Sequence, residues 1–146
     1  MKTPTLFLFS LMAILSMLHA DGTWTTDYQK ALQQASKEKK EVLLDFTGSD
    51  WCIWCQKLQK DVFSQPLFKE FAKKNLILVE IDFPQGKEQS DDLKKQNESL
   101  QKQYSVEGFP TLILLDPKGN VIKKSSGYLQ GGPEAFIAWV GNVKEK

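Results

Sequence analysis

The sequence predicts an α/β fold in which a central mixed sheet of four to five strands is flanked by helices on both faces. Three short apolar runs, at 41–47, 76–82 and 111–115, indicate strands that are buried on both faces. Segments with helical spacing of apolar residues separate these runs. With 146 residues, the chain is long enough for one domain with a hydrophobic core and too short for two.

The expected elements follow one another along the chain. They are an edge strand around Trp24, a helix from 26 to about 40, a strand at 41–47, a helix from 52 to about 61, a helix at 66–74, a strand at 76–82, an exposed helix from about 90, strands at 111–115 and 121–125, and a last helix opened by 131–133.

Several of these elements have local signals of their own. Thr25 or Thr26 can cap the first helix and Ser90 the exposed one, because their hydroxyls accept hydrogen bonds from free N–H groups. Pro66 suits the first turn of a helix. Long connections join the three apolar strands, which predicts that all three run parallel. The turn sequence at 116–120 predicts a hairpin that adds an antiparallel edge.

The first 20 residues have the pattern of a secretory signal peptide. Lys2 supplies a positive n-region, and residues 6–18 form an apolar stretch too short to span a bilayer comfortably. An uncleaved anchor is the alternative, because Leu18 is a poor residue at the third place before the mature chain. We expect a signal peptide at 1–20, a domain at 21–146 and export to the periplasm.

Composition excludes one class of function. Without residues 1–20 the chain has 18 Lys, no Arg and 18 Asp plus Glu, so it is formally neutral. A nucleic-acid-binding protein needs clustered basic charge and commonly uses Arg for bidentate contacts. We therefore expect no nucleic-acid partner.

The two cysteines, Cys52 and Cys55, lie where a buried strand is followed by a helix. A C-x-x-C pair at such a junction is typical of a dithiol that cycles between thiols and a disulfide. Cys52 would begin the helix, where free N–H groups and the helix dipole stabilise a thiolate. Cys55, one turn further in, would be more buried and would act as the resolving thiol.

Other interpretations of this pair are weaker. A structural disulfide that closes a four-residue loop stabilises a fold by only about 2 kcal/mol, against about 4.7 kcal/mol for a 100-residue loop. A zinc site or a Cys-His protease site lacks ligands, because the only histidine, His19, lies in the predicted signal peptide. We therefore expect no metal.

The element order, the Trp51-Cys52-Ile53-Trp54-Cys55 motif and the Gly108-Phe109-Pro110-Thr111 segment together resemble the thioredoxin-like superfamily. The stretch 44–52 is similar to exported, periplasmic Dsb-type thiol-disulfide reductases. The resemblance implies a thioredoxin-like fold and a redox-active disulfide that works without a bound cofactor. The chain departs from thioredoxin by having Ile53-Trp54, not Gly-Pro, between the cysteines.

The resemblance also implies a role for Asp45. It places this carboxyl group behind the second cysteine, where it takes the proton of Cys55 during resolution. A carboxylate in an apolar strand is costly unless it is protonated, hydrogen-bonded or functional, and burial would raise its pKa. The alternative is an aspartate that reaches solvent or caps the following turn.

Four further residues are expected to bind substrate. Pro110 would be cis and would present the backbone of Phe109 to an extended substrate; a trans proline that starts a strand is the alternative. Trp51 and Trp54 would form an apolar platform, although Trp51 is also a candidate for ordinary packing.

These expectations combine into a periplasmic thiol-disulfide oxidoreductase, most simply a monomeric reductase of protein or peptide disulfides. An upstream dithiol protein, such as a membrane reductase, would supply electrons. Strong oxidants of the family resemble one another in having His at the position of Trp54; an uncharged residue predicts a potential nearer the roughly −270 mV of thioredoxin than the roughly −120 mV of the strongest oxidant.

Three alternatives stay open. The first is an oxidase or isomerase of the same fold, and the second, narrower one is a cytochrome maturation reductase. The third is a redox-silent, thioredoxin-like binding or chaperone module. The polar segment 83–103 has no role that the sequence reveals.

Overall fold

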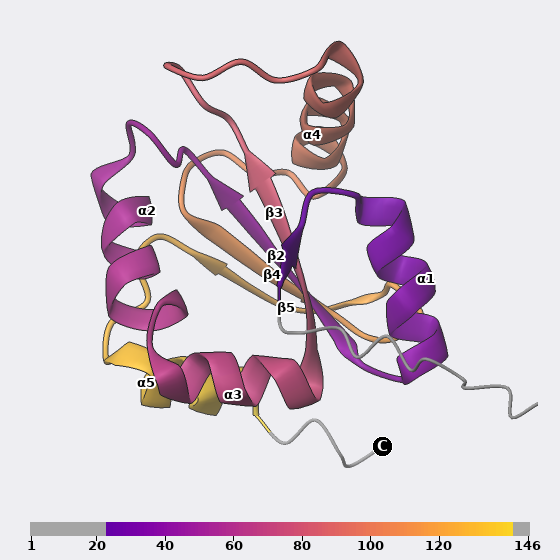
Figure 1. Cartoon of the computed structure of the whole chain (residues 1–146), viewed down its shortest axis with the longest axis vertical. Coiled ribbons are helices and arrows are strands. Elements are labelled where there is room, and N and C mark those ends of the chain that lie inside the picture. Colours follow the sequence, from indigo (N-terminus) through magenta and orange to yellow (C-terminus); the bar gives the residue numbers. More distant parts are fainter. Residues whose placement is uncertain (1–22, 142–146) are drawn as a thin grey trace, which may run out of the picture.

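Five strands form one mixed sheet in the order β1-β3-β2-β4-β5 in the computed structural model, which describes residues 23–141 (Figure 1). The strands are β1 (Trp24–Thr25), β2 (Glu41–Thr47), β3 (Leu76–Asp82), β4 (Thr111–Leu115) and β5 (Val121–Ser126). Strand β3 pairs in parallel with both β1 and β2, whereas β4 pairs antiparallel with β2 and with β5.

The prediction that all three apolar strands are parallel is wrong for β4. The register pairs Val42 with Leu115 and Phe46 with Thr111, so β4 runs opposite to β2. A parallel pair requires a long connection, but a long connection also permits an antiparallel pair. Here the 83–110 connection begins and ends at the same end of the sheet, so β4 starts where β2 finishes.

Helices cover both faces of the sheet (Figure 1). They are α1 (Tyr28–Glu38), α2 (Ile53–Leu58), α3 (Pro66–Asn75), α4 (Asp91–Gln103) and α5 (Gly132–Val140), and α2 continues into a π-helical turn, η1 (Gln59–Phe63). The predicted cap of the exposed helix is confirmed, because the Ser90 hydroxyl accepts a hydrogen bond from the Leu93 N–H at 3.2 Å.

The predicted cap of α1 is wrong. Asp27, not a threonine, directly precedes the helix, and its carboxylate accepts the Lys30 N–H at 3.0 Å. Thr25 acts one step earlier, where its hydroxyl accepts the Asp27 N–H at 3.2 Å. A carboxylate at the N-cap also interacts favourably with the positive end of the helix dipole.

The core consists of two clusters, one on each face of the sheet. Alternate residues of β2 enter different clusters, because successive strand side chains point to opposite faces. Leu44 packs in the cluster that includes α1, whereas Leu43 packs with Leu58 of α2 and with residues of α3 and α5. The side chain of Asp45 therefore falls on the face that α2 covers.

The predicted signal peptide at 1–20 lies outside the described residues. Within residues 23–141, no helix has the length and apolar character needed to cross a membrane. Two partly buried tryptophans pack against the core on the α2 face: the Trp24 ring lies 5.0 Å from the Phe63 ring, and the Trp139 ring lies 5.8 Å from the Phe136 ring.

Candidate active site

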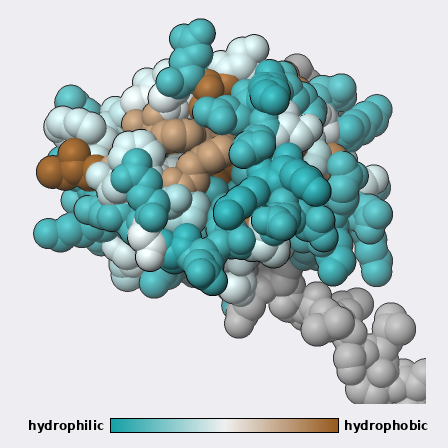
Figure 2. All heavy atoms as spheres, turned by 90° about the horizontal axis from the view of Figure 1, so that it is seen from above, coloured by the Kyte–Doolittle hydropathy of each residue, from teal (hydrophilic) through white to brown (hydrophobic). Residues whose placement is uncertain are grey.

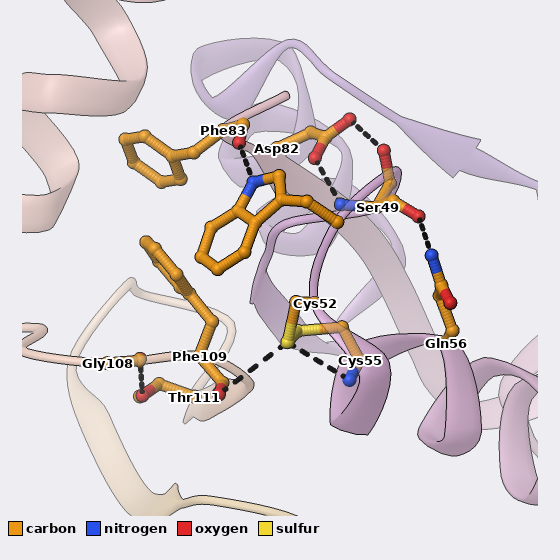
Figure 3. Close-up of a disulfide and its surroundings, with 10 residues drawn as sticks. Ser49, Cys52, Cys55, Gln56, Asp82, Phe83, Gly108, Phe109 and Thr111 are labelled. Carbon is orange, nitrogen blue, oxygen red and sulfur yellow. Dashed lines mark hydrogen bonds between the residues drawn. A yellow bond between two sulfur atoms is a disulfide. The ribbon is translucent and has the colours of Figure 1, made fainter. Parts of the chain in front are cut away.

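The junction between β2 and α2 holds the two cysteines in a disulfide (Figure 3). Cys52 is the N-cap of α2, and its Sγ accepts a hydrogen bond from the Cys55 N–H at 3.2 Å. The Cys52 N–H donates to the Gly48 carbonyl at 2.8 Å, which closes the preceding turn. The N–H of Cys55, in the first turn of α2, therefore faces the sulfur of Cys52.

The expected difference in burial between the cysteines is wrong for the disulfide form. Cys52 is 6% exposed and Cys55 is 5% exposed. The two sulfurs are covalently joined, and the backbone of Phe109 lies against Cys52, so both are shielded. Access to Cys52 therefore depends on the residues around it.

The Phe109–Pro110 peptide bond is cis, as predicted. The carbonyl oxygen of Phe109 lies 3.8 Å from Cys52 Sγ (Figure 3). A disulfide sulfur carries no hydrogen, so this approach is a contact and not a hydrogen bond. Thr111 Oγ1 donates to the Gly108 carbonyl at 2.7 Å and holds the loop. Pro110 itself is buried, which leaves the Phe109 backbone as the part of the loop beside the sulfur.

Trp51 is both anchored and exposed. Its Nε1–H donates to the Phe83 carbonyl at 2.7 Å, and its ring meets the Phe109 ring edge-on at 6.0 Å. The rings of Phe83 and Phe109 stack at 5.0 Å. Trp51 nevertheless keeps 43% of its surface exposed, so ordinary packing does not describe it fully. Phe83 is not among the site residues predicted from the sequence; its one signal is its position as an aromatic residue directly after β3.

Gly48 makes the position of Trp51 possible, which gives a testable prediction. A Cβ at Gly48 would lie 2.7 Å from Nε1 of Trp51, so Gly48→Ala should displace the indole and break its bond to Phe83. We expect a changed near-ultraviolet circular dichroism spectrum and a loss of roughly 1–3 kcal/mol in unfolding free energy, as for other overpacked sites.

Gly108→Ala is the matched control for this change. A Cβ at Gly108 meets no atom within 4 Å, although the residue lies in the loop beside the disulfide. If both variants had the wild-type spectrum and stability, Gly48 would not determine the position of Trp51.

The beginning of the polar segment 83–103 forms one wall of the site. The Asp50 carboxylate accepts the N–H groups of Gln85 at 3.0 Å and Gly86 at 2.6 Å, and these bonds lower the pKa of Asp50. Ser49 donates its N–H and hydroxyl to the Asp82 carboxylate at 2.9 and 2.5 Å (Figure 3). The loop after β3 is thus tied to the loop after β2.

The opposite wall is built around Trp54, which is 54% exposed. Its ring lies 5.7 Å from the Tyr128 ring. The Tyr128 hydroxyl donates to the Asp61 carboxylate at 2.6 Å, and Lys57 Nζ lies 2.8 Å from the same oxygen. The hydrogen bond from Lys57 holds the pKa of Asp61 below its usual range. No sequence signal links Tyr128 to Asp61, which are 67 residues apart.

Asp45 neither reaches solvent nor caps the turn, so that alternative is wrong. It is 6% exposed, and its Oδ1 has no hydrogen-bond partner among the described residues. Burial raises the pKa of Asp45 to about 8, with the carboxylates of Glu80 and Asp82 contributing. Asp45 is therefore mostly protonated at neutral pH in the disulfide form.

The chemistry available to this site is thiol-disulfide exchange. A disulfide across one helical turn opens when an external thiolate attacks one sulfur, and it closes again when the freed thiol attacks the mixed disulfide. Among residues 23–141, no group of three or more Cys, His, Asp or Glu side chains is placed to hold a metal ion. The fold and the site together define a thiol-disulfide oxidoreductase.

The chain belongs to the thioredoxin-like family: the model of the thioredoxin-like domain matches residues 28–144. It is 39% identical over 113 residues to the disulfide bond reductase DsbH of Chlamydia pneumoniae, which covers 77% of this chain and 68% of that protein. A solved structure of the DsbH oxidoreductase superposes with a TM-score of 0.77 at 35% identity, covering 91% of each chain.

A further relative is the thiol:disulfide interchange protein DsbD of Pasteurella multocida. The chain is 26% identical to it over 121 residues, which are 82% of this chain but 19% of that protein. The similarity therefore concerns one part of a much longer relative.

Proposed function

We propose that this protein reduces protein or peptide disulfides, with Cys52 as the nucleophile, Cys55 as the resolving thiol and Asp45 as the proton acceptor. The contact between the Phe109 carbonyl and Cys52 Sγ carries this proposal. An extended peptide that pairs with the Phe109 backbone would bring its own sulfur to Cys52. The relative DsbH, named as a disulfide bond reductase, supports the direction.

The exchange takes place in two steps. The Cys52 thiolate attacks a substrate disulfide; the substrate S–S bond breaks, a mixed disulfide forms, and one substrate thiolate leaves. Cys55 then gives its proton to Asp45 and attacks Cys52 Sγ, which releases the second substrate thiolate. The substrate gains two electrons, and the protein ends as the Cys52–Cys55 disulfide.

The surface around the disulfide suits an apolar substrate. Three large side chains are exposed there, namely Trp51 (43%), Ile53 (72%) and Trp54 (54%). Figure 2 looks onto the end of the molecule at which β2 and β3 finish, and brown and pale side chains form a small area there within a teal surround. We expect segments with apolar residues near their cysteine to be preferred, as in unfolded or partly folded proteins.

The redox potential tests whether the protein reduces or oxidises its substrates. Trp54 precedes the second cysteine and carries no charge, so Cys52 has the helix N-terminus but no adjacent imidazolium. We expect a potential nearer the roughly −270 mV of thioredoxin than the roughly −120 mV of the strongest oxidant, as measured by equilibration with glutathione. Trp54→His should raise it by tens of millivolts, because each pKa unit of thiolate stabilisation corresponds to about 30 mV.

Trp54→Phe is the control, because it alters the ring without adding a charge. It should leave the potential within a few millivolts of wild type. A wild-type potential near −120 mV, together with efficient oxidation of reduced substrate proteins, would show that the protein acts as an oxidase and not as a reductase. Capture of partners by a variant without either thiol would favour the redox-silent binding module.

The cellular setting is part of the proposal. We infer that residues 1–20 direct export and that residues 21–146 act in the periplasm as a monomer without a bound cofactor. A reductase in an oxidising compartment must be reduced again after each cycle, so an upstream dithiol protein, such as a membrane reductase, is required as electron donor. Fractionation of cells that express the full chain tests the location.

A further inference from the structure

Asp45 has a carboxyl neighbour that the exchange mechanism does not use. Parallel strands β2 and β3 place Asp45 and Glu80 opposite each other in register. Neighbouring strands lie about 4.8 Å apart, and register partners point to the same face of the sheet. Leu78, two residues before Glu80, packs in the cluster with α2, so Glu80 and Asp45 both point to the α2 face.

Glu80 differs from Asp45 in its access to water. The short strand β1 pairs only with Leu78 and Val79, so the outer edge of β3 is not paired with β1 from Glu80 onward. Glu80 lines a pocket of about 160 Å³ at this edge, together with Asp82, Lys87 and Glu88. A polar pocket of this size has room for several water molecules. A negative charge on Glu80 is therefore hydrated, whereas a charge on Asp45 would be buried.

The charges near Asp45 all disfavour its ionisation. From β3 these are the carboxylates of Glu80 and Asp82. Strand β4 contributes Leu112 opposite Asp45. Helix α2 contributes the cysteine pair and one cation, Lys57, which is half exposed and paired with Asp61 at 2.8 Å. Lys87 forms an ion pair with Asp82 at 3.2 Å, and Ser49 also binds Asp82.

We propose that Glu80 is a positioning residue that keeps the proton on Asp45 in the disulfide form, through its own ionised and hydrated carboxylate. This inference rests on the proposed role of Asp45 in exchange. When a donor thiolate attacks Cys52, the S–S bond breaks and Cys55 leaves with its electron pair. The leaving sulfur takes the proton of Asp45, which becomes a carboxylate; the reverse transfer occurs when Cys55 resolves a mixed disulfide.

Glu80 thus sets the pH range in which Asp45 can protonate the leaving sulfur. Two neighbouring carboxyl groups cannot both ionise easily, and the hydrated one ionises first. Burial and the Asp82 carboxylate raise the pKa of Glu80 as well, while Lys87 opposes that rise. Because Glu80 lines the pocket and Asp45 is buried, Glu80 is the carboxyl group that ionises first as pH rises. The effect of Glu80 on Asp45 is electrostatic and requires no direct contact of Glu80 with the sulfurs.

The test compares Glu80→Gln with Glu88→Gln in the oxidised protein. Both residues line the pocket, but Glu88 is exposed and lies outside β3. The carbon-13 NMR signal of the Asp45 carboxyl group should titrate near pH 8 in wild type and in Glu88→Gln, and at distinctly lower pH in Glu80→Gln. If the midpoint falls by about one pH unit, the protonated fraction of Asp45 at pH 8 falls about fivefold. The rate of reduction by dithiothreitol at pH 8, divided by the concentration of dithiothreitol thiolate, should fall by the same factor.

Two outcomes separate this inference from the proposed function. If the titration midpoint of Asp45 were unchanged in Glu80→Gln, the inference about Glu80 would be overturned, but the proposed reductase function would still stand. If Asp45→Asn had the wild-type pH dependence of the rate, the role of Asp45 in exchange would fail, whatever the midpoint did. In the Asp45→Asn background, Glu80→Gln should cause no further change in the pH profile; a further change would assign Glu80 another role and overturn the inference.

Discussion

Cys52→Ser should abolish disulfide reduction, lowering the rate by roughly three orders of magnitude or more, because the nucleophile is removed. Cys55→Ser should also stop turnover but should accumulate mixed disulfides through Cys52. The two variants should differ because the site distinguishes the two sulfurs. The Cys55 N–H donates to Cys52 Sγ at 3.2 Å, and the Phe109 carbonyl lies beside that same sulfur, so Cys52 is the cysteine that meets the substrate. Turnover is measured with a protein disulfide substrate, and trapped complexes by non-reducing electrophoresis and mass spectrometry.

The double variant, Cys52→Ser with Cys55→Ser, is the control for noncovalent capture. It should yield no complexes that a reducing agent releases. Equal trapping through Cys55 in the Cys52→Ser variant would contradict the assignment of the nucleophile. The near-equal burial of the two cysteines in the disulfide form makes this experiment decisive, because exposure alone does not distinguish them.

Asp45→Asn should stabilise the oxidised protein by roughly 2–4 kcal/mol at pH 7. The pKa of Asp45 is raised from 3.8 in the unfolded chain to about 8 in the folded protein. Between these values the unfolded chain releases a proton that the folded protein keeps, so stability falls as pH rises, by about 1.4 kcal/mol per pH unit. The buried amide of Asn offsets part of the gain, because its own polar groups lose water.

The stabilisation expected from Asp45→Asn depends on pH. The gain from Asp45→Asn should vanish below about pH 4, grow up to about pH 8 and then level off, as measured by urea unfolding of the oxidised protein at several pH values. Asp116→Asn is a control of opposite sign, because a hydrogen bond from the Asn120 side chain lowers the pKa of Asp116. A gain that did not depend on pH would mean that Asp45 ionises normally in the folded protein.

In the exchange reaction, Asp45→Asn should slow resolution of the mixed disulfide and remove the pH dependence of its rate near neutrality. The more stable variant would therefore be the slower enzyme. Such a trade-off between stability and activity is expected where a buried ionisable group serves chemistry and not folding.

The sequence by itself determined the elements and the redox pair. Apolar runs located β2, β3 and β4, because strands buried on both faces consist mostly of apolar residues. Cys52 and Cys55 were identifiable because their spacing and their place after a strand are local features. Asp45 was identifiable because a carboxyl group in an apolar strand contradicts the pattern around it.

Only the tertiary structure decided how distant segments meet. The direction of β4 depends on where a 28-residue connection, 83–110, returns to the sheet, and no local pattern encodes that. Phe83 beside Trp51, Tyr128 beside Trp54 and Glu80 beside Asp45 are contacts between segments that are far apart in the chain. The local sequence determines which backbone conformation each segment prefers. The register of strands and the packing of loops determine which charged groups and aromatic rings become neighbours.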